Sequence, residues 1–172
     1  MNHLLRLFFF VLVAFVSLQS SLMHAQLAVY GGFSAASTSG VSSQWSYGGM
    51  VGLYKQSGHL ASIINIGGDL RGSFITRNDF HYYTGAVGPR VAFKVPVLPL
   101  RPYVEGLVGV ASYNAGNASD STTHFNYQVV GGLDLTLVPH VDWRVVDFDY
   151  SAVSGQNVNA KILSTGLVIR LW

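Results

Sequence analysis

Residues 160–172 read Ala-Lys-Ile-Leu-Ser-Thr-Gly-Leu-Val-Ile-Arg-Leu-Trp, and this stretch decides the fold class. Successive side chains of an extended strand point to opposite faces. One face then carries mostly apolar residues: Thr165, Leu167, Ile169 and Leu171. The other carries small or charged residues and one valine: Ser164, Gly166, Val168 and Arg170. A strand that is apolar on one face only and ends at an aromatic residue is typical of the closing strand of a transmembrane β-barrel.

The composition agrees with a surface that meets lipid. Charged residues make up 10% of the 172 residues, against about 25% in a typical soluble domain. Hydrophobic residues make up 49%, with 19 Gly, 3 Trp, 9 Tyr and 10 Phe. The formal net charge is only +2, which gives no sign of a nucleic-acid partner. The chain has no cysteine, which excludes a structural disulfide and a lipid-modified N-terminal cysteine.

The first 25 residues have the pattern of a signal peptide. Residues 1–6 carry one firm positive charge, residues 7–16 are apolar, and residues 19–25 are polar and end at Ala25. Met23 lies three residues before the expected cut and is bulkier than the small residue that is usual there. The cleavage point is therefore defined only to within a few residues. A membrane anchor is the alternative, but the apolar stretch is shorter than the roughly 20 residues that a spanning helix needs. We therefore expect a signal peptide (1–25) followed by one domain (26–172).

Period-2 alternation recurs along the mature chain and predicts eight strands. Their expected ranges are 26–35, 45–55, 60–71, 80–94, 101–113, 123–137, 141–151 and 160–171. Three expected connections are short (56–59, 96–100 and 138–140), and four are longer and polar (36–44, 72–79, 114–122 and 152–159). This difference is typical of the periplasmic turns and extracellular loops of an outer-membrane barrel.

One face of each expected strand is apolar, and the other collects nearly all the charges. Alternation alone does not say which face is inside, because a soluble barrel shows the reverse arrangement. Three features favour a charged interior: the charges are few, both signs share the polar face, and aromatic residues gather near the strand ends as interfacial girdles. Those at one end are Phe33, Trp45, Tyr47, Phe80, Tyr113, Phe125 and Tyr150; those at the other are Tyr54, Phe93, Tyr103 and Trp143. The expected polar network of the lumen consists of Asn65, Asp69, Arg71, Arg90, Glu105, Gln128, Asp134 and Arg170.

The seventh expected strand does not fit this scheme. A regular strand would place Asp142 and Arg144 on one face and Asp147 and Asp149 on the other. Either Arg144 reaches outward near the periplasmic interface, or a bulge at Val145–Val146 reverses the phase. We favour the first explanation, because Val146, Phe148 and Tyr150 then face lipid without an irregularity.

Four motifs resemble the OmpA-like, opacity-type outer-membrane β-barrel family. They are Arg101-Pro-Tyr-Val-Glu-Gly-Leu-Val-Gly-Val, Val130-Gly-Gly-Leu-Asp-Leu, Trp143-Arg-Val-Val-Asp-Phe-Asp-Tyr and Gly166-Leu-Val-Ile-Arg-Leu-Trp. The resemblance covers the whole mature chain and implies outer-membrane lipid and the barrel-assembly machinery as partners. It also implies an assembly signal in the last strand: Gly166, Ile169, Leu171 and Trp172. Trp172 is one residue out of phase with the outward residues. A peptidoglycan-binding domain, which often follows in this family, is not expected.

Catalytic and metal sites have weak support. A lipid-modifying hydrolase would need a nucleophile beside a histidine and an acid. Asp120, Ser121 and Thr122 lie close to His124 in sequence, and His81 lies in a similar position, but the stretch reads equally well as a polar loop. The six histidines show no ligand spacing, and we expect no cofactor. A calcium site could be built from Asp134, Asp147 and Asp149. We favour ion pairs between these aspartates and Arg71, Arg90 or Arg170 in the lumen.

The sequence therefore predicts an all-β protein, an eight-stranded antiparallel up-and-down barrel in a bacterial outer membrane. Eight strands leave an interior that side chains fill, so we expect a structural or surface-interaction role through the four longer loops. The extracellular ligand is unknown. Three alternatives stay open at this point: a narrow channel in which pairs such as that of Glu105 swing apart, a secreted soluble barrel that binds an apolar ligand, and a lipid-modifying enzyme.

Overall fold

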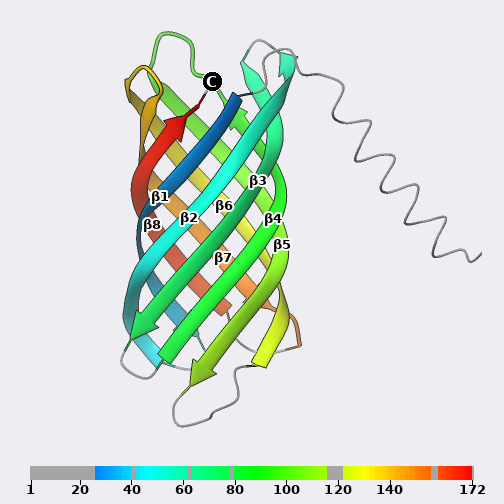
Figure 1. Cartoon of the computed structure of the whole chain (residues 1–172), viewed down its shortest axis with the longest axis vertical. Coiled ribbons are helices and arrows are strands. Elements are labelled where there is room, and N and C mark those ends of the chain that lie inside the picture. Colours follow the sequence, from blue (N-terminus) through cyan, green and yellow to red (C-terminus); the bar gives the residue numbers. More distant parts are fainter. Residues whose placement is uncertain are drawn as a thin grey trace, which may run out of the picture.

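Eight antiparallel strands close into a barrel in the computed structural model (Figure 1). The structure describes residues 26–39, 42–61, 63–77, 80–115, 122–155 and 159–171, and the predicted signal peptide lies outside this range. The strands are β1 (Gln26–Ser39), β2 (Ser42–Ala61), β3 (Ile64–Arg77), β4 (Phe80–Phe93), β5 (Leu100–Ala115), β6 (Thr122–Val138), β7 (Val141–Val153) and β8 (Asn159–Arg170). Each strand pairs with its neighbours in sequence, and β8 closes on β1. The predicted fold class is confirmed.

Six of the eight strands are longer than the sequence pattern predicted; β4 and β8 are not. Their lengths run from 12 residues in β8 to 20 in β2, whereas about 9–11 tilted residues cross a bilayer. The expected loops 36–44, 72–79, 114–122 and 152–159 are therefore partly strand, and the expected turn 56–59 lies inside β2, which contains two irregularities in its pairing with β3. Main-chain hydrogen bonds extend the ladder through polar and Gly-rich residues whose side chains show no alternation. Side-chain period alone therefore made these strands too short.

Large apolar side chains cover the outside of the barrel, and charged ones fill the inside. Val129, on the outer face of β6, is 61% exposed, whereas Arg90, on the inner face of β4, is 1% exposed. On β8 the outward residues Leu167 and Ile169 are exposed and the inward Val168 is buried. Among the described residues, no helix is long and apolar enough to cross a membrane. An apolar exterior around a charged interior is the distribution of a β-barrel that spans lipid.

Two of the aromatic residues predicted for the interfacial girdles lie inside the barrel instead. Tyr54 and Tyr103 are each 2% exposed. Phe33, Trp45 and Phe125 are exposed, as a girdle requires. The girdle prediction is wrong for the two tyrosines because it considered their distance from a strand end and neglected their phase, which they share with the inward residues Gln56 and Glu105.

A bulge in β7 places all four of its charged residues inside the barrel. Val145 and Val146 together oppose Thr165, so the register shifts between Arg144 and Asp147. The inward charged residues of β7 are then Asp142, Arg144, Asp147 and Asp149, and all four are buried. The outward orientation that we favoured for Arg144 is wrong. A buried arginine can pair with lumen carboxylates, whereas the apolar exterior offers no such partner, so one extra residue resolves the conflict.

Thr165 lies opposite this bulge on β8 and bonds the two β7 residues that precede it, so its replacement tests the bulge. Its hydroxyl donates a hydrogen bond to the Arg144 carbonyl oxygen at 2.9 Å and accepts one from Trp143 Nε1 at 3.1 Å. We expect Thr165→Val to lower the free energy of unfolding by about 1 kcal/mol, measured by urea titration of the barrel folded in detergent. Thr76→Val, at an exposed outward position of β3, is the control and should change it by less than about 0.5 kcal/mol. Equal effects of the two substitutions would contradict this role for Thr165.

Candidate functional site: the charged lumen

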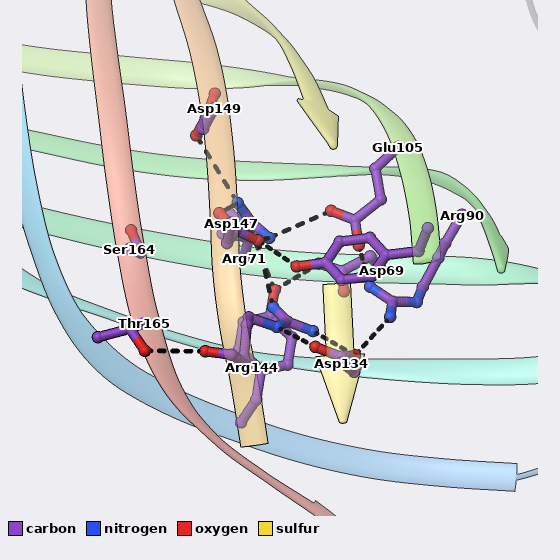
Figure 2. A network of polar contacts seen from close by, with 12 residues as sticks. Asp69, Arg71, Arg90, Glu105, Asp134, Arg144, Asp147, Asp149, Ser164 and Thr165 are labelled. Carbon is purple, nitrogen blue, oxygen red and sulfur yellow. Dashed lines mark hydrogen bonds and ion pairs between the residues drawn. The ribbon is translucent and has the colours of Figure 1, made fainter. Parts of the chain in front are cut away.

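Three arginines and three carboxylates form a closed ring of alternating charge across the lumen (Figure 2). In order around the ring they are Arg71, Glu105, Arg90, Asp134, Arg144 and Asp147, which is again paired with Arg71. They come from β3, β4, β5, β6 and β7. Because β3 and β7 are four strands apart in an eight-stranded barrel, the Arg71–Asp147 pair joins opposite walls. The ring therefore spans the lumen.

The arginines of the ring make directed hydrogen bonds. Arg71 donates to both oxygens of Asp147, at 2.9 and 2.7 Å, and to Glu105 at 3.2 Å. Arg90 bonds Glu105 and donates to Asp134 at 3.0 Å. Arg144 donates to Asp134 at 3.0 Å and lies 3.5 Å from Asp147. Each guanidinium thus bridges two acids, which offsets the cost of removing it from water.

Three tyrosines cover the faces of the guanidinium groups. The Arg90 guanidinium carbon lies 3.7 Å from the ring centroid of Tyr103 and 4.2 Å from that of Tyr54. That of Arg144 lies 4.0 Å from the ring centroid of Tyr30. The hydroxyl of Tyr103 donates to Asp147, and that of Tyr30 donates to Asp69 at 2.7 Å. Cation–π contacts of this kind are strongest where water is excluded.

Two glycines make room for two of these rings. Gly52 is the cross-strand partner of Tyr30, and Gly132 is that of Tyr103. A Cβ atom at either glycine would overlap the tyrosine ring beside it. These glycines are therefore required by close approach of a side chain and not by an unusual backbone angle.

Apolar residues and a separate ion pair occupy other parts of the lumen. Arg170 lies 3.1 Å from Asp142 and joins the inner faces of β8 and β7. One apolar cluster comprises Ala36, Ile75, Tyr82, Ala111, Val153, Ala160 and Ile162. A second comprises Ala28, Tyr30, Met50, Tyr54 and Val168. The first cluster lies toward the ends of the strands that carry the predicted extracellular loops. The second lies toward the ends that carry the predicted periplasmic turns. Apolar packing therefore flanks the charged ring on both sides.

The structure brings together five of the residues predicted for the lumen network: Asp69, Arg71, Arg90, Glu105 and Asp134. Arg170 faces the lumen but pairs with Asp142. Gln128 is buried, and Asn65 is half-buried without a contact that joins it to the ring. The prediction missed Arg144, Tyr30, Tyr54 and Tyr103. The alternation pattern puts the three tyrosines on the inner face, so it could have identified them. It could not identify Arg144, because the bulge changes the phase of β7 between Arg144 and Asp147.

The residues of the predicted assembly signal lie in and beyond β8. Ile169 and Leu171 are exposed on the outer face, and Gly166 is half-buried. Trp172 lies outside the described residues.

The catalytic candidates are only partly within the described structure. Asp120 and Ser121 lie outside the described residues, as does the side chain of Thr122. His124 is half-buried near the start of β6. His81 stacks on Tyr83, with ring centroids 6.2 Å apart. Within the described part of the chain, no group of three or more His, Cys, Asp or Glu side chains could hold a metal ion.

Several solved outer-membrane barrels are similar to this chain. No family model and no curated protein sequence matches it. Neisserial surface protein A matches with a TM-score of 0.62 at 19% identity, over 87% of this chain and 100% of that one. Ail of Yersinia pestis matches with a TM-score of 0.57 at 14% identity, over 87% and 100%. The N-terminal barrel of Pseudomonas aeruginosa OprF matches with a TM-score of 0.56 at 15% identity, over 85% and 100%.

One similar structure is an enzyme. The outer-membrane enzyme PagL matches with a TM-score of 0.54 at 15% identity, over 82% of this chain and 98% of that one. The same fold therefore serves enzymes and other proteins, and fold alone does not assign an activity. These comparisons confirm the resemblance at the level of fold: the chain has the fold of the OmpA-like, opacity-type eight-stranded outer-membrane β-barrels.

Proposed function

We propose that this chain is an integral protein of a bacterial outer membrane that has a closed lumen and a structural or surface-interaction role. The signal peptide (1–25) directs export, and the last strand is read by the barrel-assembly machinery. The observation that carries the proposal is the combination of an apolar exterior with an ion-paired ring across the lumen. Contact with partners then falls to the extracellular loops, since loops held by a rigid scaffold carry the binding functions of many proteins.

Heat-modifiability in membrane fractions tests this proposal. The unheated protein should migrate differently from the boiled protein on a semi-native gel and should remain with the outer-membrane fraction. A soluble protein with a single gel position would contradict it and would favour the secreted barrel.

Arginine substitutions on β6 test whether its outer face meets lipid. Val129 lies near the middle of β6, and Val138 lies at its end; both are exposed. We expect Val129→Arg to lower the free energy of unfolding in lipid bilayers by about 2–4 kcal/mol and Val138→Arg by about 0–1 kcal/mol, since the cost of a charge depends on its depth in the bilayer. The measurement is urea titration of the barrel folded in liposomes. Equally small effects at the two positions would place this face in water.

The closed lumen predicts that the protein does not conduct ions. Glu105 is held between Arg71 and Arg90, so a channel would require two ion pairs to open together. Purified protein in a planar bilayer should give no discrete conductance. Discrete openings that change on Glu105→Ala would favour the narrow channel instead.

We also propose that the chain is not an enzyme. His124 is half-buried, and its sequence neighbours Asp120 and Ser121 lie outside the described residues, so this proposal rests on the weak support that the sequence gives for a hydrolase site. Lipid A from a strain that expresses the protein should have the same mass spectrum as lipid A from a strain that expresses His124→Ala. A lipid A change that disappears with this substitution would show catalysis.

A further inference from the structure

The turn between β4 and β5 is apolar although it lies beyond the ends of the strands. Residues 95–100 read Val-Pro-Val-Leu-Pro-Leu and include no polar side chain. Val97 is 103% exposed and Leu98 is 54% exposed. A turn that water surrounds is normally built from polar residues. Contiguous exposed apolar side chains usually mark contact with another surface.

The backbone of this turn does not account for a valine at its tip. Val97 has a φ of 72°, in the left-handed region. A β-branched residue is strained there, whereas glycine and asparagine adopt this conformation readily. The geometry of the turn alone would thus be served better by either of those residues. A contact made by the exposed side chain outside the barrel accounts for valine.

The neighbouring turn extends the apolar patch and joins it to the wall of the barrel. The main-chain nitrogen of Thr136 donates to the Pro99 carbonyl oxygen at 2.8 Å, so the end of β6 lies beside the β4–β5 turn. Leu137 and Val138 are each 53% exposed there. Leu137 has the same phase as Val129 on the outer face of β6. Figure 1 shows both turns at the end of the barrel where the chain ends, so the patch continues the lipid-facing wall.

Positive charges flank the apolar turn on both sides. Lys94 is exposed, and Arg101 is half-buried and donates to Gln26 Oε1 at 3.4 Å. Neither cation forms an ion pair within the described part of the structure. The acidic side chains among the described residues are all buried in the lumen. The other acids that follow the expected signal peptide, Asp79 and Asp120, stand in the chain between strands that meet at the opposite end of the barrel.

An apolar tip between cations fits an anionic lipid surface or an acidic protein. Continuity with the lipid-facing wall favours lipid. We propose that the β4–β5 turn binds anionic phospholipid of the adjacent membrane leaflet. Val97 and Leu98 enter the boundary between headgroups and acyl chains, and the two cations contact the phosphate groups. This inference rests on the membrane location given under the proposed function.

A nitroxide label on the turn tests its depth in the membrane. The chain has no cysteine, so Leu98→Cys gives a single labelling site. The barrel is folded into vesicles of phosphatidylcholine, alone or mixed with phosphatidylglycerol, and both leaflets then have the same composition. Collisions of the label with dissolved oxygen and with a water-soluble nickel chelate measure its depth. The reference sites are Val129→Cys, on the middle of the outer wall, and Ser154→Cys, exposed at the opposite end.

We expect the oxygen-to-nickel ratio at residue 98 to lie between those of the two reference sites in the mixed vesicles. In phosphatidylcholine alone the ratio should fall toward that of the Ser154 site. Lys94→Gln should lower the ratio of inserted to free turn about fivefold in the mixed vesicles, which is the worth of one lysine at an anionic membrane surface.

Two further variants separate lipid binding from folding. Lys161→Gln removes an exposed lysine near the opposite end of the barrel and should leave the depth of residue 98 unchanged. Val97→Asn relieves the backbone strain, so it should keep the thermal midpoint in detergent while it reduces insertion of the turn.

Two results would overturn the proposal. A ratio at residue 98 equal to that of the Ser154 site in both kinds of vesicle would place the turn in water, where a protein partner is the better occupant. An equal depth in both kinds of vesicle, unchanged by Lys94→Gln, would mean that the turn enters lipid without recognising its charge. An aqueous ratio at Val129 would instead show that the membrane location itself is wrong.

Discussion

Replacement of Arg71 by Met is expected to lower the free energy of unfolding by about 3–5 kcal/mol, the typical cost of removing one partner from a buried ion pair. Arg71 contacts Glu105 and Asp147 and joins opposite walls of the barrel. Without it, both carboxylates lose a partner in a lumen where buried carboxylates already outnumber buried arginines. The measurement is urea titration of the barrel folded in detergent, followed by the gel shift between folded and unfolded forms.

Two further variants separate the ion pair from a general effect of mutation. Lys161→Met removes a positive charge from an exposed position on β8 and should change the free energy of unfolding by less than about 0.5 kcal/mol. The double variant Arg71→Met with Asp147→Asn should recover part of the loss, because it restores the original net charge of the lumen. Wild-type stability of Arg71→Met alone would show that the ring does not hold the barrel together.

Substitution of Gly132 by Val should destabilise the barrel by about 3–5 kcal/mol, from overpacking together with a lost hydrogen bond to a buried charge. The new Cβ atom would overlap the Tyr103 ring, which packs on Arg90 and donates its hydroxyl hydrogen to Asp147. The tyrosine must move, and both contacts are then lost. Thermal unfolding and urea titration in detergent measure the effect.

The neighbouring residue supplies a matched control. A Cβ atom at Gly131 would meet nothing within 4 Å, because this glycine lies on the outer face of β6. Gly131→Val adds the same side chain in the same strand and should be neutral within about 0.5 kcal/mol. If the two valine variants lose the same stability, the loss comes from the strand backbone and not from displacement of Tyr103.

Much of the fold was predictable because the signal for it is local. Alternation along β8 put Leu167 and Ile169 on one face and Arg170 on the other, and the structure confirms this division. The scarcity of charge then indicated which face is outside. Strand ends were predicted less well, since β2 continues to Ala61 through polar residues that show no alternation.

The sequence indicated Asp134, Asp147 and Asp149 as ion-pair partners of Arg71, Arg90 or Arg170, but it did not say which of these pairs form. Arg71 pairs with Asp147, 76 residues away, because barrel closure places β3 opposite β7. Arg144 joins the ring only because the bulge at Val145–Val146 reverses the phase of β7. Tyr103 is 2% exposed and lies on Arg90 because Gly132 leaves space for its ring.

The sequence by itself therefore determined the number of strands, their order and the face that meets lipid, since each depends on the two-residue period and on local composition. The tertiary structure decided which charges pair. Those pairings depend on register, bulge position and the strands that closure places on opposite walls. No local pattern encodes them, because the residues concerned meet only after the barrel has closed.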